Sequence, residues 1–384
     1  MKLTNRKYAA GPAGLALVAV VSAGAWATTF DFNGRASGWL GASWDTSFLG
    51  QAGLRYLPEV RLSAPICRQI TVDADASANG LVSASTRSFD STDFEARVKP
   101  YRATVRVSSP RFEARAGLQK INFGSAMLLR PLMWFDRVDP RDPLALTDGV
   151  YGLLARYYFQ NNANVWAWGL LGNSSPKGWE VSGSERWIPE PGARVQVPVP
   201  RGEVGITAHH RVASVVYGEL PSLPPDTSPA AETRVGLDGK WDVGVGLCFE
   251  ATVGKTSSDH VPYPWQRMAT VGLDYTLGIG SGLGVTAEHM LAGGADAPFG
   301  RGTDAQFSAV AVSLPFGLLD NLRAIVYFDW TNRGLFSFLG WQRTTDNWVF
   351  SLSAFANPDF PTAAGRPGAG AAGKGLRFDV VFNH

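Results

Sequence analysis

The sequence predicts an all-β protein, a transmembrane antiparallel up-and-down β-barrel of about 18 strands. Three observations predict it: an export signal at the start of the chain, many short segments in which apolar and polar residues alternate, and one more such segment at the very end. In that last segment Leu376, Phe378, Val380 and Phe382 share one face, because side chains alternate across a strand. Two residues, 383–384, extend past the final Phe.

The first 27 residues have the order of a secretory signal. Three basic residues lie in the first seven positions, an uncharged apolar stretch spans 13–23, and Ala25-Trp26-Ala27 forms a small-x-small cleavage site. The apolar stretch is short for a helix that crosses a bilayer. We therefore expect a signal peptide over 1–27, cleaved after Ala27, and a single barrel domain over 28–384.

Composition excludes several classes of protein. Cleavage removes three of the 35 basic residues and none of the 33 acidic ones, so the remaining chain has a net charge near −1 and no sign of a nucleic-acid partner. No later segment holds ~18 consecutive apolar residues, so we expect no transmembrane helix. Only Cys67 and Cys248 are present, and neither haem-attachment nor metal-ligand spacing occurs, so we expect no metal and no cofactor.

Period-two alternation marks the candidate strands. The predicted ranges are 30–44, 52–63, 69–83, 93–107, 111–123, 149–159, 163–172, 191–199, 203–212, 230–241, 243–255, 265–277, 282–292, 303–314, 320–331, 334–343, 347–356 and 374–382. The connections after even-numbered strands are short, and those after odd-numbered strands are often long. This alternation is typical of a barrel with both termini in the periplasm, and the count could also be 16.

A membrane explains the polarity of the two strand faces. The predicted inward face is rich in charge and the outward face is apolar and aromatic, and lipid allows a sheet only as a closed barrel. Tryptophans near the predicted strand ends suit aromatic girdles. The predicted lumen wall carries these cations: Arg55, Arg61, Arg97, Lys99, Arg102, Arg106, Arg115 and Arg156. Arg102 and Arg106 are the least secure of these, because the alternation slips at Pro100, which we interpret as a bulge.

On strands two, four and five these cations outnumber the acids Glu59, Glu95 and Glu113. Arginine and lysine in a narrow pore attract anions, so we expect an anion bias. The alternative is a lumen of interleaved ion pairs that holds the barrel round.

The segment 125–148 is the strongest candidate for a functional element. Its first half is too apolar for open water, so we expect it to fold into the barrel mouth or lumen. The predicted constriction residues are Arg130, Trp134, Asp136, Arg137, Asp139, Arg141 and Asp142. The alternative is a structural plug in which Arg and Asp neutralise each other.

This segment, with Gly117 and Gln119 before it and 149–159 after it, is similar to porin-like and alginate-export-like barrels of bacterial outer membranes. The resemblance covers about 45 residues. It implies a path for solutes or ions, a Gram-negative outer-membrane location, and lipid, lipopolysaccharide and the barrel-assembly machinery as partners. A monomer and a homotrimer are both compatible with it. The terminal strand resembles the insertion signal of the same group, which more often ends on the Phe itself.

The function predicted is passive or weakly selective diffusion of small hydrophilic solutes. One alternative is a structural sheath around an electron-transfer cytochrome or another outer-membrane complex. A hydrolase is a weaker alternative, because none of the five histidines has a nucleophile motif beside it and G-x-S-x-G is absent. His209 and His210 are adjacent on a strand and point to opposite faces, so we expect no shared metal and no catalytic residues.

Overall fold

A computed structural model describes residues 28–45, 47–88, 90–217, 226–358 and 373–384. The predicted signal peptide therefore lies outside the described residues, as does most of the last long connection. The strands are β1 (Thr29–Trp44), β2 (Phe48–Cys67), β3 (Ile70–Arg87), β4 (Ser91–Ser108), β5 (Phe112–Gln119), β6 (Val150–Tyr158), β7 (Asn164–Leu170), β8 (Glu190–Val199), β9 (Gly202–Tyr217), β10 (Asp226–Asp242), β11 (Gly246–Ser257), β12 (Trp265–Leu277), β13 (Leu283–Ala295), β14 (Gly302–Phe316), β15 (Asp320–Asp329), β16 (Gly334–Thr344), β17 (Trp348–Asn357) and β18 (Gly373–Asn383).

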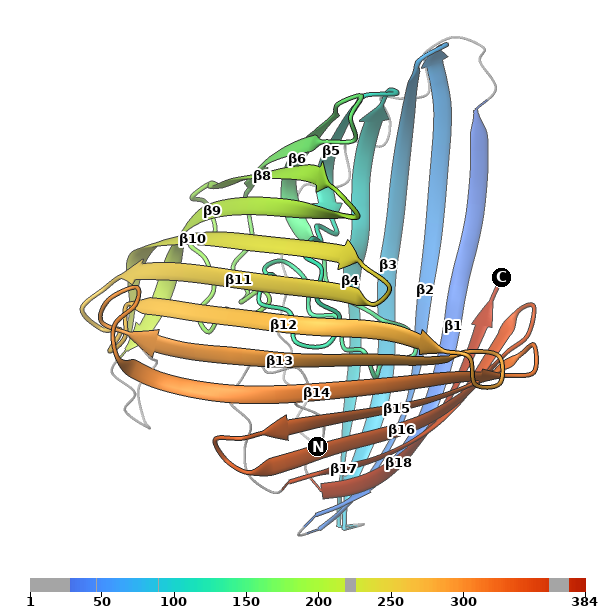
Figure 1. Cartoon of the computed structure of the whole chain (residues 1–384). Coiled ribbons are helices and arrows are strands. Elements are labelled where there is room, and N and C mark those ends of the chain that lie inside the picture. Colours follow the sequence, from blue (N-terminus) through green and yellow to red (C-terminus); the bar gives the residue numbers. More distant parts are fainter. Residues whose placement is uncertain (1–27, 46, 89, 218–225, 359–372) are drawn as a thin grey trace.

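Each strand pairs antiparallel with its neighbours in sequence, and β1 also pairs with β18, so the 18 strands form one closed barrel (Figure 1). The predicted fold class and strand number are confirmed. The largest differences lie in β2, β9 and β10, which are 20, 16 and 17 residues long and exceed their predicted ranges. The ends of these strands pair with their neighbours although their alternation is irregular, so the alternation of apolar residues does not mark them.

No helix among the described residues is long and apolar enough to cross a membrane.

The end of the chain takes part in closure. The β1–β18 ladder runs from Arg35 opposite Asn383 to Trp44 opposite Lys374. His384 adds one further rung, because its N–H donates to Gly34 O and its carbonyl accepts from Gly34 N–H, both at 3.0 Å. Its ring lies over Gly34, where a Cβ would have no room. The two-residue overhang is therefore part of the sheet.

The predicted bulge at Pro100 is confirmed. Ser77 lies opposite Arg102 and Ala78 lies opposite Pro100, so Tyr101 is the extra residue of β4. An extra residue exchanges the two faces of a strand. Arg102 and Arg106 consequently join the inward face, where Arg106 pairs with Asp73 at 2.7 Å.

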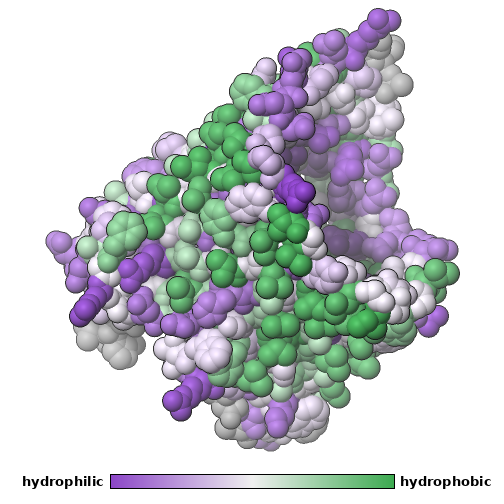
Figure 2. Space-filling view, viewed as in Figure 1, coloured by the Kyte–Doolittle hydropathy of each residue, from purple (hydrophilic) through white to green (hydrophobic). Residues whose placement is uncertain are grey.

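The outer face is apolar across the front strands of Figure 2, whereas the hollow beside β1 to β3 is lined by hydrophilic residues. On β1, Phe32 lies near the His384 ring and Trp44 lies near Phe48, with ring centroids 5.6 and 5.8 Å apart. Phe32 and Trp44 are twelve residues apart, so on a strand tilted by about 45° they are separated by about 28 Å along the membrane normal. This spacing matches the apolar band between two aromatic girdles.

Candidate functional site

The connection between β5 and β6 crosses the inside of the barrel, as predicted. Ser125 Oγ donates hydrogen bonds to Gly239 O and Phe249 O, at 3.1 and 3.0 Å. Leu128 and Leu129 then pack into a buried cluster on the far wall, formed by Met290, Ala309, Ile325, Tyr327 and Phe336 of β13 to β16. These two leucines are thus buried against the wall opposite β5, whereas Leu132, Trp134 and Phe135 pack against residues of β6 and β7.

Two wall glutamates bind the backbone of this segment. Glu288 of β13 accepts hydrogen bonds from the N–H groups of Met127, Leu128 and Leu129, at 2.6 to 2.9 Å. Glu250 of β11 accepts from the N–H groups of Ala126 and Leu132, at 2.8 and 2.9 Å. Five backbone donors of a segment without regular secondary structure are satisfied by two side chains.

The hydrogen bonds between these glutamates and the backbone of the segment offset two unfavourable contributions to folding. A buried carboxylate is unfavourable unless it is hydrogen-bonded, and so is a buried N–H without an acceptor. Glu250 and Glu288 are 0% and 3% exposed, and each is the only acidic residue of its strand. Alternation along β11 puts Glu250 on the face opposite the apolar one, but it does not show what the side chain binds. A single acid within an otherwise apolar or small-residue strand was the signal available.

Three of the predicted constriction residues, Arg130, Trp134 and Asp136, are buried and not exposed to the lumen as predicted, although Asp136 lies in the lining of a cavity of about 610 Å³. Arg130 Nη1 and Asp136 Oδ2 form a buried ion pair at 2.9 Å. Trp134 is 1% exposed, within a cluster that includes Phe123, Phe135 and Trp168. The apolar surroundings of this part of the segment favour a local ion pair over exposure to solvent.

A second segment, residues 171–189 between β7 and β8, also lies inside the barrel, and sequence analysis treated it only as a long connection. Trp179 Nε1 donates to Arg130 O at 2.7 Å, and Arg137 Nε donates to Gly178 O at 3.1 Å. The two inserted segments therefore support each other.

The second segment is fixed to the wall by a buried charge network. Glu180 pairs with Arg211 and Arg234, at 3.1 and 2.5 Å, and Lys177 pairs with Glu190 at 3.2 Å. Glu232 of β10 completes the network through Arg211 at 2.8 Å. Three cations face three carboxylates, so the network is neutral overall and each charge has a partner. It docks this segment on β8 to β10.

Cavities remain open between the inserted segments and the wall, and two of them share lining residues. One, of about 280 Å³, is lined by Asp139, Arg141 and Asp142 of the first segment and by residues of β1, β2 and β16 to β18. The other, of about 610 Å³, is lined by β2 to β4, by the ends of the first segment and by residues 172–178. Both are lined by Arg55 and Asp142. These two residues therefore mark the neck where the cavities meet.

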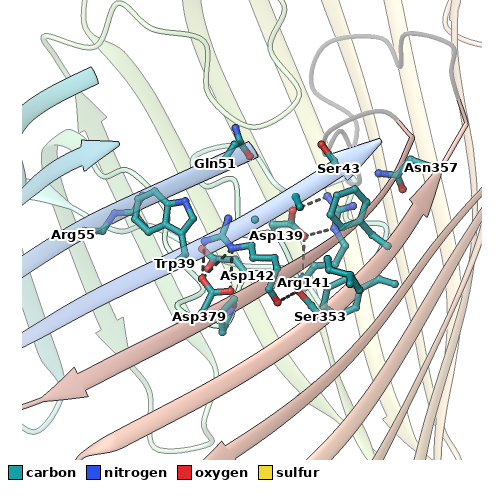
Figure 3. Close-up of a pocket in the computed structure, with 17 residues that line it drawn as sticks. Trp39, Ser43, Gln51, Arg55, Asp139, Arg141, Asp142, Ser353, Asn357 and Asp379 are labelled. Atoms are coloured by element: carbon teal, nitrogen blue, oxygen red, sulfur yellow. Dashed lines mark hydrogen bonds and ion pairs between the residues drawn. The ribbon is translucent and has the colours of Figure 1, made fainter. Parts of the chain in front are cut away.

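Arg55 differs from its neighbours in this neck. Its guanidinium lies 5.5 Å from the Trp39 ring, and no ion pair to it occurs in the part of the chain that the structure describes. Figure 3 shows Arg55 of β2 beside Trp39 of β1, with Asp142 next to them. Trp39 lies over Gly53, where a Cβ would have no room.

Apart from Arg55 and Asp142, the charged residues that line the smaller cavity are paired. Arg141 binds Asp139 at 2.8 Å, and Arg377 binds Asp379 at 2.7 Å. Burial alone would raise the pKa of Asp139, but the hydrogen bonds and positive charge of Arg141 hold that pKa below its ordinary value. The Asp139–Arg141 pair is therefore charged at neutral pH, and its two opposite charges contribute little net field.

The predicted lumen wall divides into two groups. Arg55, Arg97 and Lys99 line the larger cavity, where Lys99 is bonded to Asp148. Arg61, Arg115 and Arg156 do not line either cavity. Arg61 pairs with Asp75 at 2.7 Å, and Arg115 and Arg156 share Glu113 at 2.9 and 3.6 Å. In this second group the arginines are neutralised by carboxylates, as in the alternative of a lumen wall held by interleaved ion pairs.

The histidines do not form a cluster. His209 is buried beside Trp168 and Glu190, whereas His210 is exposed and bonds Thr233. His289 bonds Ser308 at 2.9 Å. No group of His, Cys, Asp and Glu suited to a metal ion occurs among the described residues.

Fold and site together define a class: a porin-like barrel of 18 strands whose lumen is narrowed by inserted segments. No protein-family model matches the chain, and no curated protein matches its sequence.

Solved structures do resemble it. OccAB4 of Acinetobacter baumannii aligns with a TM-score of 0.60 and 10% identity, over 92% of this chain and 98% of that chain. OccD3 (OpdP) of Pseudomonas aeruginosa aligns with a TM-score of 0.54 and 9% identity, over 92% and 91%. OccK7 (OpdD) of the same species aligns with 0.54 and 11%, over 92% and 99%. At these identities the likeness shows the fold alone.

The role of Glu288 is testable by substitution. In Glu288→Gln one acceptor oxygen becomes an NH₂ group that faces backbone N–H donors, so the first segment should loosen. Hydrogen bonds to a charged acceptor contribute about 1.5–3 kcal/mol each, so a loss of a few kcal/mol is expected. Hydrogen exchange at residues 126–132 should accelerate in the folded barrel. Glu203→Gln, at an exposed position of β9, is the matched control, and equal exchange in both variants would contradict the assignment.

Proposed function

We propose that this chain is an outer-membrane channel through which small hydrophilic solutes diffuse passively or with weak selectivity, with a bias toward anions. The observation that carries the proposal is the neck between the two cavities, where Arg55 faces the lumen without an ion pair in the described part of the chain. A guanidinium that no carboxylate binds directly attracts anions and repels cations in a narrow neck.

The larger cavity supports the same bias. Arg137 at its edge donates to a neutral carbonyl, Gly178 O, and Arg97 lies 3.8 Å from Glu95 with half of its side chain exposed. Asp142 is the opposing carboxylate of the neck, and it accepts backbone N–H bonds from Leu144 and Leu146. Positive charge exceeds negative charge along the open part of the lumen.

The expected location follows from the fold and from the apolar outer face. We propose a Gram-negative outer membrane, with the turns after the even-numbered strands on the periplasmic side. Outer-membrane lipid, lipopolysaccharide and the assembly machinery are the partners that this location implies, with a monomer and a homotrimer both left open. The alginate-export-like resemblance remains a proposal about the solute, which the cationic neck would accept as an anion.

The sheath alternative is less well supported. A sheath needs a wide lumen, whereas both inserted segments are packed inside this barrel and bonded to its wall. The hydrolase alternative gains no support from His289, since its partner Ser308 also accepts from Trp330 Nε1 and no carboxylate completes a triad among the described residues.

Arg55→Gln should reduce the anion preference. Removing the positive charge of the neck, which leaves the Asp142 carboxylate in place, should lower the ratio of anion to cation permeability roughly twofold or more. The measurement is the reversal potential of the purified barrel in planar bilayers under a KCl gradient.

Arg61→Gln is the matched control for this variant, because Arg61 is paired with Glu59 and Asp75 away from both cavities. An equal shift in both variants would reject the neck as the selective element. Absence of any discrete conductance in the wild-type barrel would reject the channel itself.

Deletion of residues 128–135 should enlarge single-channel conductance. The deletion removes two of the N–H groups bound to Glu288 and the apolar residues that fill the space between β5 and β13 to β16. The widened lumen should pass more current at the same voltage. A conductance equal to that of the wild type would show that this segment does not limit the path.

A further inference from the structure

Strands β1 to β3 continue past the closed ring of the barrel. β1 pairs with β2 from Thr29 onward, but its pairing with β18 starts at Arg35, with one added rung between Gly34 and His384. Among the described residues, 29–33 therefore have a neighbouring strand on one side only. Figure 1 shows the ends of β1 to β3 rising well beyond the C terminus.

The open side of this stretch presents unused backbone groups. In an antiparallel ladder both polar groups of a residue point to the same side, and the side changes with each residue. The backbone N–H and C=O of Gly34 bond to His384, so the backbone N–H and C=O of Phe32 and Phe30 point to the same side of the strand. Neither has a backbone partner there among the described residues. The result is a free sheet edge, which we call the β1 edge and define as Thr29–Asn33.

This edge lacks the usual protection. Natural edge strands are blunted by Lys, Pro or a bulge, which prevent another strand from pairing. The neighbouring end of β2 shows such protection, because Pro65 and a register shift at Pro65/Cys67 interrupt it. The β1 edge has none of these, and its register with β2 is regular from Thr29 to Trp44. An edge without Lys, Pro or a bulge, beside one that Pro and a register shift interrupt, is open to pairing with an added strand.

The β1 edge also lies at the water side of the aromatic girdle. The ring of His384 stacks near Tyr56 and lies near Phe32, with centroids 5.9 and 5.6 Å apart. Phe30 lies beyond this group and is 63% exposed, and Ile66 and Ile70 at the hairpin tip are also exposed. Apolar side chains on a projection outside the bilayer indicate a surface that a partner covers.

The charge of the edge specifies the partner further. Asp31 lies between Phe30 and Phe32 on the opposite face, and it has no ion pair in the described part of the chain. Arg61, its register neighbour on β2, is bonded to Glu59 and Asp75 instead. A strand added to this edge would therefore place a cation near Asp31 and apolar side chains near the two phenylalanines.

We propose that the β1 edge binds an extended segment of another protein, which adds as an antiparallel strand of about five residues alternating cationic and apolar side chains. The added strand continues the line of β18 beyond His384. In the orientation proposed above, the partner is a periplasmic protein. Only this location of the partner rests on the proposed function. The pairing itself does not depend on conduction.

The test uses the full barrel in nanodiscs and a fluorescein-labelled seven-residue peptide that alternates valine and lysine. We expect saturable binding by fluorescence anisotropy. Phe30→Pro removes an N–H that points to the open side and spares the β1–β2 ladder, so it should weaken binding at least tenfold. Phe30→Ala keeps that N–H and should retain most of the binding. Asp31→Lys should reverse the preference toward a peptide that alternates valine and glutamate.

A second arm does not depend on how the variants fold. The same peptide with N-methylated backbone amides keeps its side chains but cannot pair, so it should not bind the wild-type barrel. Equal binding of the N-methylated peptide, or unchanged binding by Phe30→Pro, would overturn the proposal. A concentration-dependent dimer that Phe30→Pro abolishes would assign the edge to a second copy and overturn it as well. Absence of conductance with intact peptide binding would reject only the channel.

Discussion

The structure depends on one constraint, that a backbone N–H or C=O removed from water has to find a partner inside the protein. The closed ladder of 18 strands meets it in the membrane, and the pairing of His384 with Gly34 extends it to the last residue. Inside the barrel, where no strand is available, Glu250 and Glu288 meet it for five N–H groups of the first inserted segment. The β1 edge lies on the water side, where this constraint is relaxed, and the described chain leaves its outward backbone groups without a partner strand.

The same constraint explains how the lumen becomes narrow without becoming closed. An irregular segment cannot lie against an apolar wall unless its polar backbone is bonded, so its course follows the available acceptors. Those acceptors lie on β11 and β13, and the charge network that holds the second segment lies on β8 to β10. Both segments are drawn to one half of the circumference. The opposite half, formed by β1 to β4 and β17 to β18, keeps its charged face toward water.

Much of the fold was predictable from sequence because a barrel wall has a period of two that can be read without knowing any contact. The strand number and the bulge at Pro100 follow from alternation and its interruption, and the inward course of 125–148 follows from its apolar first half. The site was less predictable. Arg130 and Asp136 were expected in open lumen, but their burial depends on how the segment packs, which no local pattern encodes. The second segment was missed because its residues are polar in sequence and become buried only through pairing with Arg211 and Arg234.

Because Glu250 and Glu288 lie on one side of the barrel, its circumference has two arcs that differ in their tolerance to substitution. On the arc from β8 to β16, a substitution alters what holds the inserted segments, so its effects would spread through the whole lumen. On the arc from β17 through β1 to β4, side chains such as Arg55 and Arg97 touch the open path and little else. Substitutions on the arc that lines the open path can therefore change solute preference one residue at a time. The other arc keeps the inserted segments in place and so keeps the path narrow.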